Sequence, residues 1–264
     1  MFAEERQRRI AELVSEAGRV NVTDLAADFD ITTETVRRDL AALEKAGALQ
    51  RVHGGAVPCR PHSLEEPAFD DREIHNLDEK TAIARSALSL LEETMSISVD
   101  GGTTCAAFAR AIADEAHGRL VAGQAPRQLR VITNSLSAID SLAGAPGVDI
   151  FVLPGRFRPV TRAVVGPQTI TAIEGHRVDL AVLGTNGLTG DGVSTPDHDE
   201  AATKSAFVHS GRRVAVLADS AKFDAVSLVR FAELDQIDVL ITDDAPEESL
   251  SADLETAEVE VVTP

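Results

Sequence analysis

The sequence predicts an α/β protein in two parts: a small helical domain at the amino terminus and a larger domain built around a mostly parallel sheet. Three observations lead to this prediction. The first 57 residues show helical spacing of apolar side chains, residues 58–68 contain three prolines and no periodicity, and the rest alternates short apolar strands with helical stretches. A length of 264 residues also exceeds that of one typical domain. We therefore expect domains at residues 1–57 and 69–264, joined by a linker at 58–68.

Apolar periodicity in the first domain predicts three helices and a hairpin. The expected helices cover residues 6–15, a short stretch capped by Thr23, and a stretch that Thr32 or Thr33 caps and that runs to Ala46. A tight turn at Asp30 and Ile31 separates the last two helices. Residues 49–57 then read as two short strands that meet at Gly54 and Gly55, which is a hairpin signal.

The second domain is expected to begin with a helix over residues 69–91. Six strands are then expected at residues 97–99, 131–133, 150–153, 180–183, 214–217 and 239–241, mostly alternating with helices. Segments such as Leu-Ala-Val-Leu at 180–183 lack the alternation of a half-exposed strand. Such runs are typical of parallel strands that are covered on both faces.

Composition and charge narrow the classes of function. The first 60 residues carry 9 basic and 10 acidic residues, and residues 61–264 carry 16 and 33, so the formal charge of -18 belongs almost entirely to the second part. With no Trp, no Tyr and 9 Phe, the chain has few aromatic side chains that could stack on unpaired bases. This composition argues against binding of RNA or single-stranded DNA and leaves duplex DNA possible.

No apolar run is long enough for a membrane span and the first ten residues are rich in charge, so we expect a soluble cytoplasmic protein without a membrane partner. Cys59 and Cys105 lack metal-type spacing, and no metal, disulfide or cofactor is expected.

Arg37 and Arg38 stand side by side in the third predicted helix. On a helical wheel Arg38 points away from the apolar stripe, while Asp39 is expected to form an internal ion pair. The arginines lie either on a solvated face, where Arg38 pairs with Glu34, or on DNA. A helix that recognises bases in the major groove needs a short turn before it, small hydroxyl residues at its start and then arginines. The predicted helix has all three, so this context favours DNA binding. Positive charge beside this helix is expected from Arg6, Arg8 and Arg9 of the first helix.

Three segments of the first domain carry a resemblance to a known family. They are Arg6, Ile10 and Val14 at four-residue steps, the run Thr32-x-x-Thr35-Val36-Arg37-Arg38-Asp39-Leu40, and the closing Arg51-Val52-His53-Gly54-Gly55-Ala56. Together they resemble the DeoR family of bacterial repressors over most of residues 6–57. The resemblance implies a winged helix-turn-helix that binds operator DNA. It places Thr33, Thr35, Arg37 and Arg38 in the groove and Arg51 and His53 on the DNA backbone.

Ligands of open parallel sheets bind where the strands end, and the loops after the six strands are rich in Gly, Ser, Asn and Asp. Most of these residues also suit ordinary turns and helix caps. The loop Asp-Gly-Gly-Thr-Thr at 100–104 differs, because its glycines permit close backbone approach and its threonines stand at a helix amino terminus, where free amides bind anions. It is either a phosphate site or a capped turn. It matches neither a GxGxxG fingerprint nor a Walker loop, so no nucleotide is implied.

A phosphorylated ligand in so acidic a domain needs positive side chains. Lys204 and Lys222 are the candidates, although Lys204 could instead pair with Glu200 on a helix surface and Lys222 could have no binding role. Cys105, next to the glycine and threonine loop, is interpreted as a small core residue and not as a sensor.

The resemblance to the DeoR family continues at residues 96–223. Its segments include Val-Asp-Gly-Gly-Thr-Thr, Val-Ile-Thr-Asn-Ser, Leu-Gly-Thr-Asn-Gly-Leu and Leu-Ala-Asp-Ser-Ala-Lys-Phe. It implies a sensor domain that is similar to ribose-5-phosphate isomerase and responds to phosphorylated sugars or related metabolites. The implied pocket residues are Asp100, Gly102, Thr103, Thr104, Asn134, Ser135, Asn186, Gly187, Glu200, Lys204 and Lys222. Where the family often has two glycines after the third strand, this chain has Gly155 and Arg156, and Arg156 either binds a second phosphate or lies in solvent.

The residues and the resemblance predict a DNA-binding transcriptional regulator and not an enzyme. We expect a repressor of carbohydrate uptake or catabolism genes that binds double-stranded operator DNA as a homo-oligomer, a dimer or a tetramer, and that a phosphorylated sugar releases or modulates. The alternative is a sugar-phosphate isomerase-like enzyme with an accessory DNA-binding domain, in which Asp197, Asp199 or Glu200 would act as the base. A pure interaction scaffold is a third alternative.

Overall fold

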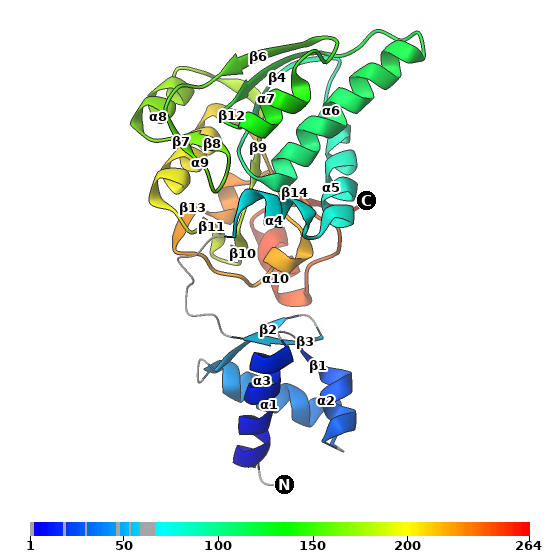
Figure 1. The fold of residues 1–264 in the computed structure, drawn as a ribbon, viewed down its shortest axis with the longest axis vertical. Helices are drawn as coiled ribbons and strands as arrows, with labels where there is room; N and C mark the ends of the chain where they lie inside the picture. Colours follow the sequence, from blue (N-terminus) through cyan, green and yellow to red (C-terminus); the bar gives the residue numbers. More distant parts are fainter. Residues whose placement is uncertain (1–2, 18–19, 30, 46–47, 53, 59–66) are drawn as a thin grey trace. The chain divides into compact units, whose positions relative to one another are not determined.

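The chain forms two compact units, Met1–Ser63 and Leu64–Pro264. The computed structural model describes residues 3–17, 20–29, 31–45, 48–52, 54–58 and 67–264 (Figure 1). Most of the predicted linker at 58–68 lies outside the described residues, as do Asp30 of the expected turn and His53 of the expected hairpin.

The three helices predicted in the first unit are present. They are α1 (Ala3–Ala17), α2 (Val22–Asp28) and α3 (Thr33–Lys45). Thr32 caps α3, because its Oγ1 accepts a hydrogen bond from the backbone N–H of Thr35 at 3.2 Å. The cap predicted at Thr23 is wrong: α2 begins at Val22, directly after a short strand that ends at Asn21, and Thr23 lies inside the helix.

The predicted hairpin is also present and gains a third strand. Strands β2 (Leu49–Val52) and β3 (Gly55–Pro58) pair in antiparallel fashion, and β1 (Val20–Asn21) pairs with the other edge of β3. A Cβ atom on Gly55 would lie 1.9 Å from the carbonyl oxygen of Val20, so the close approach of β1 requires glycine there.

One apolar core holds the first unit together. Its fully buried members come from all three helices and from the sheet: Ile10, Val14, Val22, Leu25, Val36, Leu40, Leu43, Leu49 and Ala56. The stripe on α3 consists of the residues that the helical wheel assigns to the core, and this leaves the opposite face of α3 in solvent.

The second unit is built on a seven-stranded parallel sheet with the order β15-β14-β12-β9-β4-β5-β6. Its strands are β4 (Thr94–Val99), β5 (Gln128–Thr133), β6 (Val148–Val152), β9 (Val178–Gly184), β12 (Gly211–Leu217), β14 (Val239–Ile241) and β15 (Glu260–Val262). All six predicted strands are among them. The short edge strand β15 was not predicted.

Helices cover both faces of this sheet (Figure 1). The helices α5 (Leu77–Ala87), α6 (Thr103–Val121) and α7 (Leu136–Leu142) pack on one face. The other face is packed against α8 (Pro167–Glu174), α9 (His198–Ser210) and α10 (Glu248–Thr256). Along β9, Leu180 and Val182 enter the first core while Ala181 and Leu183 enter the second, which is why this strand reads as a continuous apolar run.

Smaller elements complete the second unit. They are α4 (Phe69–Ile74), the hairpin β7 (Arg156–Arg158) and β8 (Ala163–Val165), and a three-stranded antiparallel sheet of β10 (Gly187–Thr189), β11 (Gly192–Thr195) and β13 (Val229–Ala232). There are also single 3-10 turns at Leu88–Leu90, Ser220–Lys222 and Leu234–Gln236.

The single helix predicted over residues 69–91 is wrong, because the structure divides it into α4, α5 and a 3-10 turn. The break between α4 and α5 lies at Asn76, whose backbone adopts the left-handed conformation with a φ of 52°. Asn tolerates that conformation better than most residues, and the Nδ2 of Asn76 donates to Asp219 at 3.0 Å. A tertiary hydrogen bond therefore holds a break that helical periodicity cannot reveal.

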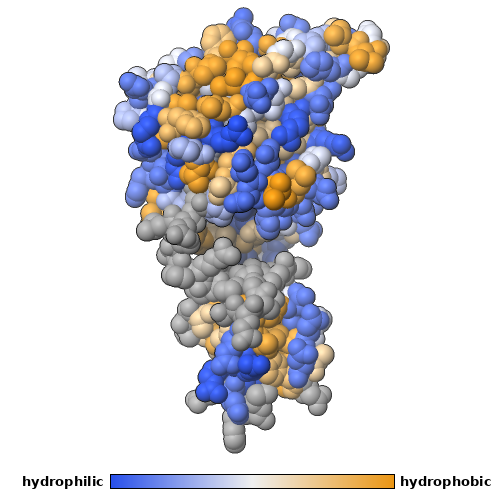
Figure 2. Space-filling view, viewed as in Figure 1, coloured by the Kyte–Doolittle hydropathy of each residue, from blue (hydrophilic) through white to orange (hydrophobic). Residues whose placement is uncertain are grey.

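The visible surface of the second unit is largely hydrophilic, with separate hydrophobic patches (Figure 2). The exposed large apolar side chains include Ile74 and Leu77 beside the break at Asn76, and Phe151 and Val152 on the edge strand β6. Scattered apolar residues of this kind are normal on protein surfaces.

Candidate functional site

The outer face of α3 carries the residues that the sequence assigns to DNA. Thr33, Arg37 and Arg38 are exposed, and Thr35 is half-buried. The nearest ion-pair contact of Arg37 joins its Nη1 to Glu34 at 3.9 Å, and the side chain of Arg37 remains 63% exposed. Arg38 makes no hydrogen bond or ion pair with the part of the chain that the structure describes, so the expected alternative pair with Glu34 does not form.

Asp39 lies on the inner side of α3 and is only 3% exposed. Its carboxylate accepts hydrogen bonds from the Nε of Arg6 at 2.6 Å and from the Nε2 of Gln7 at 2.9 Å. The hydrogen bond to Asp39 raises the pKa of Arg6. The internal ion pair expected for Asp39 is thus present. The role expected for Arg6 is corrected, because this arginine is committed to Asp39 and adds no free positive charge beside α3.

The wing residues can be placed only in part. Arg51 lies on β2, where its backbone is opposite Ala56 of β3. Its side chain and the whole of His53 lie outside the described residues.

The topology of the sheet predicts where the second unit binds a ligand. From β4 the chain builds β5 and β6 on one side and later β9, β12, β14 and β15 on the other. Strand order therefore reverses between β4 and β9, and ligands of open α/β sheets bind beyond the carboxyl ends of the strands at such a point. The loops that follow β4 and β9 begin at Asp100 and at Thr185.

A small cleft of about 60 Å³ lies at this edge. Five segments line it: the α4–α5 break, the start of α6, the loop after β9, the loop after β12, and α9. The lining residues are Arg72, His75, Lys80, Gly101, Gly102, Thr103, Thr104, Gly184, Thr185, Asn186, Glu200, Lys204, Asp219 and Lys222.

The amino terminus of α6 provides the backbone donors of this cleft. Gly102 precedes the helix with a φ of 105°, a conformation that favours glycine, and a Cβ atom there would meet no atom within 4 Å. The space in front of Gly102 is therefore open. Thr103 and Thr104 follow as the first residues of a 19-residue helix, whose first amides have no partner within the helix and suit an anion.

Lys204 lies at the bottom of the cleft and is 2% exposed. Its Nζ donates to the carboxylate of Asp100 and to the carbonyl of Gly184 at 3.0 Å, and it lies 3.5 Å from Oε1 of Glu200. Burial lowers the pKa of Lys204, but Asp100 and Glu200 more than offset this effect, so that its pKa is raised and the ammonium is retained. The alternative of a surface pair with Glu200 is wrong: the pair exists, but in the interior.

Asp100 lies beneath the cleft and is not part of its lining. Burial raises the pKa of its carboxyl, while Lys204 opposes this shift. Glu200 connects a second cation, because its Oε2 lies 3.4 Å from Nη1 of Arg158. Asp100, Lys204, Glu200 and Arg158 thus form one network of alternating charge that reaches the cleft through Lys204 and Glu200.

A second group of cations also lines the cleft. Lys80 is 5% exposed, and its Nζ donates to the backbone carbonyls of Arg72 and His75 at 2.5 Å each. Burial lowers the pKa of Lys80, Asp219 opposes the shift, and the positive charges of Lys222 and Arg72 lower it further. Lys222 is half-buried, and no carboxylate lies within ion-pair distance of it in the described ranges.

The structure brings seven of the eleven predicted pocket residues together: Gly102, Thr103, Thr104, Asn186, Glu200, Lys204 and Lys222. The other four lie outside the lining. Ser135 caps α7, and its Oγ accepts from the amide of Ala138, while the Nδ2 of Asn134 donates to the carbonyl of Val164 at 2.9 Å. A Cβ atom on Gly187 would lie 2.1 Å from the carbonyl oxygen of Ala225, so this glycine has a packing role.

Arg156 and Cys105 also lie outside the cleft lining. The exposed Nη2 of Arg156 contacts Asp199 at 2.5 Å. Cys105 lies on α6 and is fully buried in the first core of the second unit, where burial raises the pKa of its thiol. This agrees with the interpretation of Cys105 as a core residue.

Sequence reasoning missed the contribution of the α4–α5 segment, which supplies Arg72, His75 and Lys80. One signal was available. Lys80 precedes Ile83, Ala84 and Ala87 at helical spacing, so it interrupts the apolar stripe of α5 with a charge. A lysine at such a position needs buried acceptors, and it finds them in the carbonyls at the end of α4.

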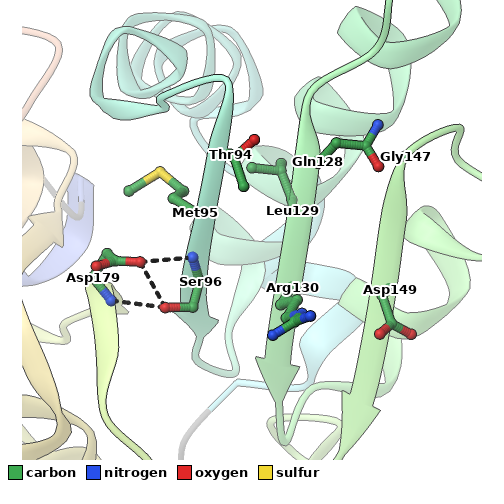
Figure 3. Close-up of a pocket in the computed structure, with 9 residues that line it drawn as sticks. All are labelled: Thr94, Met95, Ser96, Gln128, Leu129, Arg130, Gly147, Asp149 and Asp179. Carbon is green, nitrogen blue, oxygen red and sulfur yellow. Dashed lines mark hydrogen bonds between the residues drawn. The ribbon is translucent and has the colours of Figure 1, made fainter.

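A larger cavity, of about 530 Å³, lies at the opposite edge of the sheet, where β4, β5, β6 and β9 begin (Figure 3). There the carboxylate of Asp179 accepts hydrogen bonds from the backbone N–H and the Oγ of Ser96 at 2.9 and 2.7 Å. These hydrogen bonds lower the pKa of Asp179. The cavity contains no predicted pocket residue and no helix amino terminus, so its size alone does not make it the better candidate.

The two units define a class of protein: a DNA-binding regulator with a helix-turn-helix unit and an α/β sensor unit. Comparison with protein families agrees with this class. Residues 6–62 match the DeoR-like helix-turn-helix domain, and residues 75–244 match the DeoR C terminal sensor domain. The chain belongs to the DeoR family of transcriptional regulators.

Full-length relatives support the assignment. The chain is 35% identical to the HTH-type transcriptional regulator GlpR of Haloferax volcanii, over 99% of this chain and 98% of the relative. It is 30% identical to the HTH-type transcriptional repressor CsqR of Escherichia coli, over 98% and 95%. It is 31% identical to the Glycerol-3-phosphate regulon repressor of Haemophilus influenzae, over 92% and 90%.

Among solved structures, the chain resembles ribose 5-phosphate isomerase A of Methanocaldococcus jannaschii with a TM-score of 0.40 and 16% identity. The likeness covers 56% of this chain and 55% of the isomerase. In the ranges that the structure describes, no helix is long and apolar enough to cross a membrane.

Proposed function

We propose that this regulator represses genes of carbohydrate uptake or catabolism and that a phosphorylated sugar changes its affinity for operator DNA. One observation carries the proposal. The same chain presents an arginine-bearing helix face on which Arg38 has no partner among the described residues, and a cleft that is lined by both a helix amino terminus and the half-buried Lys222. The first feature suits duplex DNA and the second suits a small phosphorylated ligand.

On the DNA side, Thr33, Thr35, Arg37 and Arg38 would enter the major groove. Small side chains at the start of α3 allow the helix to approach the base edges, and arginine binds guanine or phosphate. One unit of this size covers little DNA, so we propose that the chain acts as a homo-oligomer in the cytoplasm. The acidic remainder of the chain would oppose loose attachment to other DNA.

On the ligand side, the amides at Gly102, Thr103 and Thr104 would receive the phosphate, and Lys222 would neutralise part of its charge. Glu200 and Asn186 would face the hydroxyl groups of the sugar. The buried pair of Lys204 and Asp100 would support this arrangement from below. We propose supporting roles for Asn134, Ser135 and Gly187, which lie outside the lining.

We propose that the cleft binds its ligand without turnover. Asp197 caps α9 and contacts Arg158 at 3.5 Å, Asp199 is exposed and contacts Arg156, and Glu200 lies between Lys204 and Arg158. Each of the three candidate bases is therefore already engaged by a cationic side chain. Isomer conversion after the pure protein is incubated with pentose and hexose phosphates would favour the isomerase alternative instead.

The direct test combines binding of operator DNA with a panel of phosphorylated sugars. Fluorescence anisotropy with labelled DNA from the region upstream of the chain's own gene and its neighbours would measure DNA affinity, and calorimetry would measure ligand affinity. At least one phosphorylated sugar should bind and change the DNA affinity, while its unphosphorylated form should do neither. A panel in which no phosphorylated sugar binds would refute the proposal.

A further inference from the structure

The break between α4 and α5 is built around one buried ammonium. An ammonium carries three N–H donors. Two of those of Lys80 are used by the carbonyls of Arg72 and His75, and no third acceptor is found among the residues that the structure describes. Lys80 is nevertheless 95% buried and faces the cleft.

Lys80 lies among charges of both signs. Arg72 and Lys222 line the same cleft, and their positive charges act on Lys80, whereas the negative charges of Asp219 and Glu79 act on it in the opposite sense. Asp219 is already an acceptor for the Nδ2 of Asn76. Lys222 has no ion pair within the described ranges, so an anion in the cleft would meet the ammonium groups of both Lys80 and Lys222.

The segment also has a special position along the chain. α4 is the first helix after the proline-rich residues 58–68, and it has only six residues. Its end is held by the hydrogen bonds from Lys80 and by the contact of Asn76 with Asp219, and all of these border the cleft. A ligand that binds Lys80 therefore acts on the first described helix of the second unit.

We propose that the α4–α5 break is the second half of the anion site: the phosphate that the amides of α6 receive also accepts the third N–H of Lys80, and its binding tightens the end of α4. This inference rests on the proposed function. It adds the residues of the α4–α5 break, whose arrangement would change when phosphate occupies the cleft. Ligand binding then stabilises one arrangement of α4, and a ligand with such a preference shifts an equilibrium between states.

The experiment uses inorganic phosphate as the probe and the full-length protein. Calorimetry should show that Lys80→Met weakens phosphate binding by roughly tenfold or more, because one charge-assisted hydrogen bond is lost. Arg85→Met is the matched control, since Arg85 lies on the exposed side of the same helix, outside the cleft, and should bind phosphate like the wild type. Equal affinity of Lys80→Met and wild type would overturn the inference while leaving the proposed function in place.

Hydrogen exchange of the wild-type protein keeps the test decisive if Lys80→Met does not fold. Saturating phosphate should slow the amides of residues 72–80 as well as those at the start of α6. Protection confined to residues 101–104 would overturn the inference and support the proposed function. If phosphate and all phosphorylated sugars fail to bind the wild type, both the inference and the proposed function are wrong.

Discussion

The Nε of Arg6 on α1 donates to the carboxylate of Asp39 on α3 at 2.6 Å, with both side chains largely buried. This contact joins the first helix to the third and uses the acidic residue that follows Arg37 and Arg38. Because Asp39 is engaged on the inner side of α3, it does not neutralise the arginines on the outer side. The first unit thus presents positive charge locally, although the chain has a net charge of -18.

Replacing Asp39 with Ala should destabilise the first unit by about 1–3 kcal/mol, because Arg6 and Gln7 lose a buried acceptor. Faster hydrogen exchange of the amides in α1 and α3 would measure the loss. The control is Glu12→Ala, which removes an exposed partner of Arg9 and should change stability by less than about 1 kcal/mol. Similar effects of the two substitutions would contradict a structural role for the buried pair.

Replacing Arg38 with Ala should weaken operator binding by about 1–3 kcal/mol without changing stability, because Arg38 has no partner within the described part of the chain. If Arg38 binds a phosphate, the slope of log affinity against log salt should also fall by about 0.9. Fluorescence anisotropy at several salt concentrations provides both values. Arg85→Ala removes the same charge from the second unit, and an equal loss in that control would point to a general charge effect.

Replacing Gly102 with Ala should affect ligand binding more than folding. The residue has a φ of 105°, so any side chain is strained by about 1–3 kcal/mol, and the added methyl group would enter the open space of the cleft. Gly123→Ala is a matched control, because Gly123 also has a positive φ and open space but lies outside the cleft. Calorimetry should show lost phosphate binding only for Gly102→Ala. Phosphate binding that is retained in both variants would argue against an anion site at the start of α6.

Replacing Lys204 with Met should destabilise the second unit by about 3–5 kcal/mol near neutral pH, because the buried Asp100 loses its counter-charge. The loss should depend on pH. Burial raises the pKa of Asp100, and without Lys204 the folded protein retains the proton of Asp100 more strongly than the unfolded chain does. Stability of the variant relative to wild type should therefore fall as pH rises above the unfolded pKa of Asp100.

Thermal unfolding followed by circular dichroism at pH 5 and pH 8 would check the Lys204 prediction. The melting temperature of Lys204→Met should lie closer to that of the wild type at pH 5. Lys222→Met is the control, because Lys222 is only half-buried and lacks an ion pair in the described ranges. If the melting temperature of Lys204→Met lies equally far below that of the wild type at both pH values, Asp100 is not the group left unpaired.

Much of the fold follows from local patterns. The spacing of Ile10, Val14, Val36 and Leu40 predicts the helices of the first unit, and continuous apolar runs predict six of the seven parallel strands. These signals are strong because burying one face of a helix, or both faces of a strand, requires apolar residues at a fixed period. The position of the glycine and threonine loop after β4 follows from the same periodicity.

Local patterns fail where a long-range contact decides the structure. The break at Asn76 depends on Asp219, which is 143 residues further along the chain. The burial of Lys204 depends on Asp100, which is 104 residues away. Neither partner can be chosen from spacing alone, and helical propensity favours the wrong answer at residues 69–91.

The sequence by itself determined that this chain has a helical DNA-reading unit and a parallel α/β unit, and it identified the family and the loop at 100–104, because those features are encoded in periodicity and short segments. Only the tertiary structure decided which polar residues meet. In the folded protein Lys204 is buried between two carboxylates, Arg6 pairs with Asp39 and adds no free positive charge beside α3, and Lys80 lines the cleft. The reason is physical: a buried charge needs partners, and the fold selects those partners from distant parts of the chain.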